Sequence, residues 1–416
     1  MIFGVIVSHI LRRLLLAATP ITVIITFDEN SGVMNIISKS GLGTINEIRK
    51  KFRKRRFDED LVFEVGRINR NLLKQMLVVC GRVGEANIAQ YADKATEIGA
   101  DFIVEQGRSW ILTKKTIREN YDPSYHKGVL LIGTNKELPA TQISYEGTYG
   151  FTDWFIQDLD NDGKPDFPFG RIFGPPKTVL YHMDPYIVDS NIAIVFDSQP
   201  GRSDKHAKAL AELGFDVEVL HRYTQEEEKL LSVSEFILQF SDGVFTARIH
   251  GTPDRWATHN SVILSYDQAS AIGFQGYPVV FSEACSTAQE GPLLKAFLNS
   301  GASYIGATLD TMNNVEPFED WRKCAYCDGW KFGLLDLLDS YDLIGEVKLA
   351  VDRALTENLE PKVLVEIEKV RNGDSTTLTI DKSVSAVEWM LYGNPLRSAP
   401  AGPNADFTPG RISVDT

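Results

Sequence analysis

Short apolar runs alternate with segments of helical periodicity once the chain has passed residue 75. The apolar runs predict buried strands at residues 76–80, 101–104 and 128–133. Apolar spacing predicts a helix over residues 86–98, which ends before Gly99, a residue type that commonly caps helix C-termini. Residues 113–121 predict a second, shorter helix. Strands that alternate with helices in this way predict an α/β fold with a parallel sheet flanked by helices.

The same alternation resumes near residue 190. Strands are predicted at residues 191–197, 216–220, 243–249, 277–281 and 302–307. Helices are predicted at residues 205–213, 224–240 and 292–298. Beyond these elements, residues 330–355 predict a long helix, and residues 363–380 predict an added β segment that turns at Asn372-Gly373.

These patterns divide the chain into four parts. Residues 1–72 form an N-terminal segment of unclear fold, and residues 73–190 predict a smaller α/β subdomain. Residues 191–397 predict the larger subdomain that carries the main sheet. Residues 398–416 are rich in Pro, Gly, Asp and Ser, which predicts a flexible tail.

Composition excludes several classes of protein. Of the 416 residues, 43% are hydrophobic and 24% are charged, values that exclude wholesale disorder, collagen and coiled coil. The chain has 43 Lys and Arg against 56 Asp and Glu, a formal net charge of −13. Because this charge repels the phosphate backbone, we expect no nucleic-acid partner. Four cysteines cannot form a disulfide scaffold for a chain of this length.

The N-terminal segment opens with two apolar runs, residues 1–10 and 14–27, separated by Arg12 and Arg13. A charged stretch before a short apolar one is typical of signal peptides, but no A-x-A-like cleavage site follows. The second run is also shorter than the roughly 20 residues of a membrane-spanning helix. Two buried strands or a buried helix are the simpler explanation of the runs. The pattern leaves a signal, an anchor and a pro-segment open, and with them membrane association.

Two reactive residues follow predicted strands directly. His250-Gly251 follows one apolar strand, and Ala284-Cys285 follows another. Ligands of open parallel sheets bind at the carboxyl ends of the strands, where both residues would lie. A cysteine nucleophile needs a partner that holds it as thiolate or protonates its leaving group. Either residue alone is more simply a buried cysteine or a loop histidine, but together they predict a catalytic pair. His259 is the rival base.

The order of strand, His-Gly, strand and Ala-Cys resembles the caspase-like cysteine peptidases. Further segments are similar to the gingipain branch of that clan over residues 75–397: Trp256 downstream of the histidine, Gly170-Arg171 after an acidic loop, Ala284-Cys285-Ser286-Thr287, and residues 392–396. Two positions depart from the family pattern. Ile249 stands where the family usually has Gly, and Asn394 stands where it often has Asp.

The resemblance implies a caspase-like parallel sheet, preceded by the smaller subdomain, and a cysteine endopeptidase that acts on proteins or peptides. Cys285 would attack the scissile carbonyl group, and His250 would protonate the leaving amine and then activate water. Backbone N–H groups of Gly251 and Cys285 would stabilise the oxyanion. The alternatives are a non-catalytic, calcium-stabilised surface or binding module of the same fold, and another thiol enzyme such as an acyltransferase.

The resemblance also assigns Trp256 and Glu283 to substrate binding. In the family pattern, the side chain two positions before the nucleophile often lines the pocket for the residue before the scissile bond. A carboxylate at Glu283 would select Lys or Arg there through a charge-assisted hydrogen bond. The competing interpretation is that Glu283 pairs with a local cation or points away from the cleft.

Residues 158–166 read D-x-D-x-D-G-x-x-D and predict a structural calcium loop. The ligands would be Asp158, Asp160, Asp162 and Asp166. Alternate carboxylates in a tight loop supply the oxygen ligands that Ca²⁺ prefers. The loop is not an EF-hand, because Phe169 stands where an EF-hand has its bidentate glutamate. It resembles the calcium loops of surface repeat proteins. The sequence leaves the location open, with a secreted or cell-surface location slightly favoured. A plain acidic turn is the alternative.

Cys324 and Cys327 form a single CxxC pair. A zinc site needs a second pair of ligands, and only Cys80 and scattered histidines remain to supply it. Two thiols or one local disulfide are therefore the simpler interpretations of this pair.

Overall fold

The computed structural model describes much of the chain from residue 75 onward and three short strands before it. The described residues are 22–28, 33–39, 67–68, 75–184, 186–187, 192–197, 204–221, 244–248, 250–257, 262–270, 278–310, 322, 333–338, 340–359, 361–379 and 385–400. Contacts divide the chain into unit 1, Met1–Ile68, and unit 2, Asn69–Thr416.

Unit 1 contains an antiparallel hairpin within the predicted segment of unclear fold. Its strands are β1 (Thr22–Asp28) and β2 (Val33–Lys39), and they pair over their whole length. Both strands are rich in β-branched and aromatic residues, and Asn30-Ser31-Gly32 between them are typical turn residues. The second N-terminal apolar run therefore forms a strand over residues 22–27. The third described strand of this unit is β3 (Arg67–Ile68).

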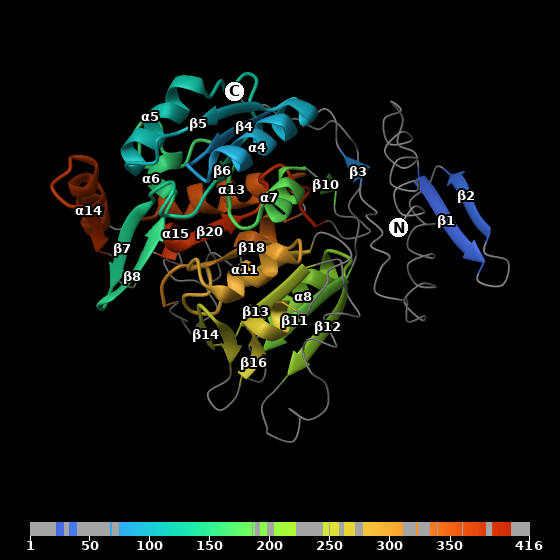
Figure 1. Ribbon diagram of the computed structural model, residues 1–416. Coiled ribbons are helices and arrows are strands. Elements are labelled where there is room, and N and C mark those ends of the chain that lie inside the picture. Colours follow the sequence, from blue (N-terminus) through green and yellow to red (C-terminus); the bar gives the residue numbers. More distant parts are fainter. Residues whose placement is uncertain are drawn as a thin grey trace. The chain divides into compact units, whose positions relative to one another are not determined.

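Ten described strands of unit 2 form one sheet, in the order β12-β11-β13-β17-β18-β20-β9-β6-β4-β5 (Figure 1). Their bounds are β4 Met76–Cys80, β5 Asp101–Val104, β6 Gly128–Ile132, β9 Phe169–Ile172, β11 Ile192–Asp197, β12 Asp216–His221, β13 Val244–Arg248, β17 Val279–Ser282, β18 Ser303–Ala307 and β20 Trp389–Tyr392. Neighbouring strands are parallel except for β18 and β20. The sheet therefore consists of two parallel halves that run in opposite directions. This architecture confirms the predicted α/β class, and it continues through both predicted subdomains.

Helices cover both faces of the sheet. Their bounds are α4 Glu85–Ile98, α5 Trp110–Asn120, α6 Trp154–Gln157, α7 Pro176–Met183, α8 Asp204–Glu212, α10 Tyr266–Ser270, α11 Pro292–Asn299, α13 Ile344–Thr356, α14 Pro361–Arg371 and α15 Ser385–Glu388. Strand β4 sends Met76, Val78 and Cys80 into the core under α4, α7 and α11. Leu77 and Val79 enter the opposite core with α5 and α6. Burial on both faces explains why the parallel strands are continuous apolar runs.

Two small sheets extend unit 2 and were not predicted as strands. One has the order β19-β7-β8, with bounds β7 Thr141–Tyr145, β8 Thr148–Thr152 and β19 Thr377–Thr379. The other comprises β14 His250–Thr252, β15 Arg255–Ala257 and β16 Val262–Ser265, and a further short strand is β10 Tyr186–Ile187. Between β7 and β8, Glu146 and Gly147 have φ angles of 47° and 85°, as two-residue hairpin turns require.

The structure corrects three predictions near the C-terminus. Residues 361–371 form helix α14, because Val363, Ile367 and Val370 recur at helical spacing and are buried together. Of the residues of the predicted β segment that the structure describes, only β19 is a strand, and it pairs in parallel with β7. The predicted helix over residues 330–355 is interrupted, since helix α13 begins only at Ile344 and Leu343 forms a bridge with Ser398.

The predicted tail also begins too early. Ser398 and Ala399 are buried, and the Ala399 N–H donates to the Asp342 carbonyl over 2.8 Å. The start of the predicted tail is therefore tied to the chain ahead of α13. The helix predicted over residues 224–240 lies outside the described residues.

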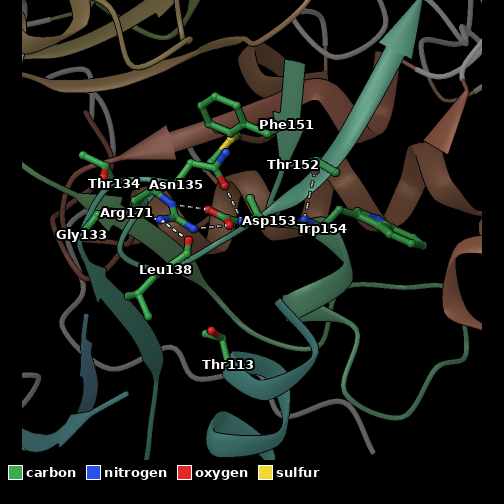
Figure 2. Close-up of polar contacts among 12 residues, drawn as sticks. Thr113, Gly133, Thr134, Asn135, Leu138, Phe151, Thr152, Asp153, Trp154 and Arg171 are labelled. Carbon is green, nitrogen blue, oxygen red and sulfur yellow. Dashed lines mark hydrogen bonds and ion pairs between the residues drawn. The ribbon is translucent and has the colours of Figure 1, made fainter. Parts of the chain in front are cut away.

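A buried ion pair ties the β9 strand to the loops beside it (Figure 2). The Arg171 side chain has no exposed surface. Its Nε and Nη2 donate to the two carboxylate oxygens of Asp153 over 2.8 and 2.6 Å. Its Nη1 donates to the Gly133 and Leu138 carbonyls, each over 3.0 Å. Because every guanidinium nitrogen and both carboxylate oxygens hydrogen-bond, the burial of the pair is tolerated and the loops after β6 and β8 keep their positions.

A second, half-buried carboxyl group connects this cluster to the loop that follows Cys285. Glu290 Oε1 accepts a 2.6 Å hydrogen bond from the Asn135 N–H. Burial raises the pKa of Glu290 to about 7, and the charge of Arg171 and the Asn135 hydrogen bond oppose that rise. The negative charges of Asp153 and Glu137 add to the rise. Ionisation of Glu290 therefore costs free energy in the folded state.

We expect Glu290→Gln to become more stable relative to wild type as pH rises. The folded-state pKa of Glu290 lies above its unfolded value, so the wild type loses stability between about pH 4.5 and 7, on the order of 1–3 kcal/mol. Urea unfolding of both proteins at pH 5 and pH 8 measures the change. Glu119→Gln, at an exposed position on α5, is the control and should show no such trend. A stability difference for Glu290→Gln that is equal at both pH values would contradict the assignment.

Candidate functional site

Cys285 lies just beyond the carboxyl end of a central strand. Strand β17 ends at Ser282, which is in register with Gly306 of the parallel neighbour β18. Three residues later, Cys285 has a half-buried side chain. The thiol is therefore held at the edge of the sheet where parallel α/β folds place their ligands.

His250 reaches the same edge from the strand on the other side of β17. Strand β13 ends at Arg248, and its Ala247 is in register with Ser282 of β17. His250 then opens strand β14 and has an exposed side chain. Two parallel neighbours thus bring the predicted base and nucleophile to one edge.

Gly251 shows how closely the two segments approach. A Cβ atom at Gly251 would lie 2.5 Å from the Ala284 Cβ and 2.5 Å from the Thr287 Cγ2. It would lie 2.9 Å from the carbonyl oxygen of Cys285. Only glycine fits here, so the backbone next to His250 lies directly against the backbone that carries Cys285. The structure therefore brings together His250, Gly251 and Cys285 as the sequence predicts, while their chemical roles stay predictions.

Trp256 supports this contact from inside the protein. The indole has no exposed surface, and its Nε1 donates to the Ser282 Oγ over 3.1 Å. The Ser282 Oγ hydrogen-bonds to Thr287 Oγ1 over 2.9 Å, and Thr287 Oγ1 donates to the Ala284 carbonyl over 3.0 Å. This chain of bonds fixes the turn on both sides of Cys285. The Trp256 side chain has no exposed surface with which to make the substrate contact predicted for it.

Ser286 has an unusual backbone conformation directly after the nucleophile candidate. Its φ angle is 56°, a left-handed value that non-glycine residues adopt infrequently. Its N–H donates to the Leu309 carbonyl over 2.8 Å, and its Oγ donates to Asp310 Oδ1 over 3.1 Å. Such conformations persist where the surroundings over-determine them, and they gather at functional sites.

Three carboxyl groups lie around this segment. Glu283, predicted to bind substrate, is 4% exposed, and Glu388 is 3% exposed. Asp310 is exposed. Burial raises the pKa of Glu388 well above its usual range, and the negative charge of Asp310 adds to the rise. Neither Asp310 nor Glu388 was predicted, although a polar residue just after the strand predicted at residues 302–307 is a signal that could have found Asp310.

The acidic loop gathers three of its four predicted ligands. Carboxylate oxygens of Asp158, Asp160 and Asp166 all lie within 4.8 Å of one another. Asp162 lies outside this group, and its Oδ1 accepts from the Lys164 N–H over 2.8 Å. Burial raises the pKa values of Asp158 and Asp166. A hard divalent cation fits this set of oxygens, and it would offset their mutual repulsion.

Two cationic side chains also reach the acidic loop. Arg371, at the end of α14, forms an ion pair with Asp158 Oδ2. Lys114 is buried and donates to Asn161 Oδ1 over 2.6 Å. Burial lowers the pKa of Lys114 to about 8, although the charge of Asp158 opposes that fall. The chain therefore supplies positive charge of its own at the predicted metal site.

Asn394, one of the departures from the family pattern, both donates and accepts hydrogen bonds through its side-chain amide, whereas an ionised carboxylate can only accept. It is fully buried, and its Nδ2 donates to the Met183 carbonyl over 2.9 Å. Its Oδ1 accepts from the Leu396 N–H over 2.9 Å. An ionised Asp could accept the second bond but could not donate the first.

Several predicted features lie outside the described residues: His259, Ile249, Cys324 and Cys327. Within the part of the chain that is described, the helices all fall short of the length and apolar character needed to cross a membrane.

Comparison with known proteins shows which solved structures share this fold. No protein-family model matches the sequence, and no curated protein matches it. Among solved structures, the Arg-specific cysteine proteinase gingipain R matches with a TM-score of 0.54 and 14% identity, over 80% of this chain and 79% of that one. A structure described only as a protease matches with a TM-score of 0.53 and 15% identity, over 79% and 78%. This chain therefore has the caspase-like fold of gingipain R.

Proposed function

We propose that this protein is a cysteine endopeptidase in which Cys285 is the nucleophile and His250 is the general acid–base group. The observation that carries the proposal is the close approach of Gly251 to Ala284 and Cys285, which sets the histidine segment against the cysteine segment. The fold supports it, because the solved structures that share this fold include a cysteine proteinase.

In the first step the Cys285 thiolate attacks the scissile carbonyl carbon, so that an S–C bond forms. The C–N bond then breaks, and the imidazolium of His250 donates its proton to the departing amine. The product of this step is a thioester between Cys285 and the acyl part of the substrate. An exposed His250 at the sheet edge can reach the leaving group from the solvent side.

In the second step His250 removes a proton from water, and the resulting hydroxide attacks the thioester carbonyl carbon. The C–S bond breaks and restores the Cys285 thiolate, while the acyl product leaves as a carboxylic acid that releases its proton to solvent. The N–H groups of Gly251 and Cys285 stabilise the negative oxygen that forms in both steps. The hydrogen bonds around Ser282 and Thr287 hold the turn that carries the Cys285 N–H. A donor held in place needs no reorganisation as the negative charge forms, which lowers the barrier.

The proposed substrates are proteins or peptides with Lys or Arg before the scissile bond. Gingipain R, which shares the fold, is described as Arg-specific. Acidic residues at the sheet edge, with Asp310 exposed among them, favour a cationic substrate side chain and repel an anionic one.

We propose in addition that the acidic loop binds a structural calcium ion through Asp158, Asp160 and Asp166. The clustering of their carboxylate oxygens within 4.8 Å supports this assignment. Arg353 donates to the Pro165 carbonyl over 2.7 Å, and Lys164 pairs with Glu357 over 2.8 Å, so the loop is joined to helix α13. Order in the loop would therefore stabilise the packing of this helix.

We expect Cys285→Ala to abolish peptide cleavage without loss of fold, because the side chain is small and lies at a strand end. His250→Ala should lower kcat/KM by about 10²–10⁴-fold, the usual contribution of a general acid–base group. Release of a fluorophore from peptide substrates measures both, and circular dichroism checks the fold. A peptidyl acyloxymethyl ketone should label wild type and fail to label Cys285→Ala.

Near-normal turnover in either folded variant would overturn the assignment of that residue. A calcium-replete wild type that neither cleaves nor is labelled would favour the non-catalytic module of the same fold. Labelling of Cys285 together with acyl transfer to an amine, and without hydrolysis, would identify the acyltransferase alternative.

We expect Gly251→Ala to impair the site because the added methyl group would collide with Ala284, Thr287 and the Cys285 carbonyl. The change should lower kcat/KM at least tenfold and lower the Tm by a few degrees. Gly147→Ala is the matched control, since Gly147 lies at a hairpin tip with open space around it and a φ of 85°. It should lower the Tm through backbone strain and leave kcat/KM unchanged. Equal activity of both variants would show that the two segments are not in close contact.

We expect chelation of calcium to lower the Tm of the wild type. A ligand at a hundredfold excess over its Kd stabilises the folded state by about 2.7 kcal/mol. Asp160→Ala should remove the dependence of Tm on calcium, whereas Asp162→Ala should retain it because Asp162 lies outside the cluster. A thermal transition that EDTA leaves unmoved would show that the loop is an acidic turn closed by Arg371 and Lys114.

A further inference from the structure

We propose that Asp310 is the carboxylate that determines specificity, and that it receives the basic side chain of the residue whose carbonyl group Cys285 attacks. This inference rests on the proposed peptidase function and names the residue that selects its substrates. It replaces Glu283, to which the sequence pattern assigned that role.

Asp310 lies at the same sheet edge as Cys285. Strand β18 is the parallel neighbour of β17, and Asp310 follows its last residue, Ala307, by three positions. The Ser286 Oγ donates to Asp310 Oδ1 over 3.1 Å, and the Ser286 N–H donates to the Leu309 carbonyl over 2.8 Å. The carboxylate is therefore hydrogen-bonded to the residue that directly follows the nucleophile.

Exposure separates Asp310 from the other carboxyl groups near Cys285. Glu283 is 4% exposed and Glu388 is 3% exposed, so both are covered by protein. Asp310 is exposed and can meet a substrate side chain without rearrangement. Burial and the charge of Asp310 raise the pKa of Glu388, which favours its neutral form beside Asp310. Of these three groups, Asp310 thus combines negative charge with access.

The position suits a cation on the substrate. A carboxylate offers about four lone-pair positions, and Ser286 uses one of them. The remaining positions can accept from a guanidinium or ammonium group in a charge-assisted hydrogen bond. An acidic substrate side chain would meet like charge from Asp310. Ser286 has a left-handed backbone conformation and hydrogen-bonds to Asp310 through its side chain. It therefore holds the Asp310 carboxylate in a fixed position relative to Cys285, the residue before it.

The decisive variant is Asp310→Asn, which keeps an oxygen that can accept from Ser286 and removes the charge. Fluorogenic peptides that differ only before the reporter, with Arg, Lys, Gln, Leu or Asp, measure kcat/KM. For Arg and Lys we expect a fall of about 10- to 100-fold, as loss of a charge-assisted bond produces. For Leu and Gln the change should stay within about threefold. Asp310→Glu, which restores the charge, should recover most of the basic preference.

The matched control is Asp216→Asn, which removes one exposed negative charge at the amino end of β12, at the opposite edge of the same parallel half. It should leave the ratio of Arg to Leu cleavage unchanged. If the ratio falls equally in both variants, the preference reflects overall charge and not Asp310. If Glu283→Gln abolishes the preference while Asp310→Asn retains it, Glu283 holds the role and the inference is overturned.

A binding measurement separates this inference from the peptidase function itself. Agmatine carries a guanidinium group and no scissile bond, so calorimetry can measure its binding to Cys285→Ala protein. Adding Asp310→Asn to that protein should raise the Kd at least tenfold. Absence of agmatine binding, or binding that Asp310→Asn leaves unchanged, would overturn the inference. Asp310-dependent binding in a protein whose wild type cleaves no peptide would overturn only the proposed function.

Discussion

The antiparallel pairing of β18 with β20 is the contact on which the rest of unit 2 depends, because it joins two parallel half-sheets that run in opposite directions. Tyr304 pairs with Tyr392, and Ala307 pairs with Trp389, across this seam. Side chains of both seam strands are buried, among them Tyr304 and Ile305 of β18 and Leu391 and Tyr392 of β20. The carboxyl ends of the two halves lie at opposite edges of the sheet. The edge that holds His250 and Cys285 therefore also receives the amino ends of β20 and β9, together with the loops that precede them.

The loop after Cys285 is held by both halves. Its Ser286 and Ala288 N–H groups donate to the Leu309 and Ala307 carbonyls of the same half. Gln289 Nε2 donates to the Tyr149 carbonyl of β8 over 3.2 Å, and Glu290 accepts from Asn135. Because the segment is fixed along its length, the left-handed conformation of Ser286 can persist next to Cys285, the proposed nucleophile. Such fixation is what a nucleophile and its oxyanion donors need, since misplacement by about 1 Å can cost a hundredfold in rate.

The acidic residues of this protein differ in how burial affects their charge. Asp153 is buried against Arg171, whose guanidinium satisfies both carboxylate oxygens. Glu290 and Glu388 lie in surroundings that disfavour their charged forms, which raises their pKa values. Asp310 stays exposed near Glu388. The net charge of −13 therefore says little about the site, where the accessible negative charge depends on which carboxyl group the fold leaves at the surface.

The sequence by itself determined the strand and helix alternation, the placement of His250 and Cys285 after strands, and the acidic loop. These features are local: an apolar run must be buried wherever it lies, and a residue that follows a strand must lie at a sheet edge. Only the tertiary structure decided which strands pair and in which direction, because β18 and β20 are separated by more than eighty residues. It also decided that Trp256 and Glu283 are buried and that Asp310 is exposed, since burial depends on neighbours from distant segments. The helical period of Val363, Ile367 and Val370 was present in the sequence, but their partners Ile143 and Leu378 came together only in the fold.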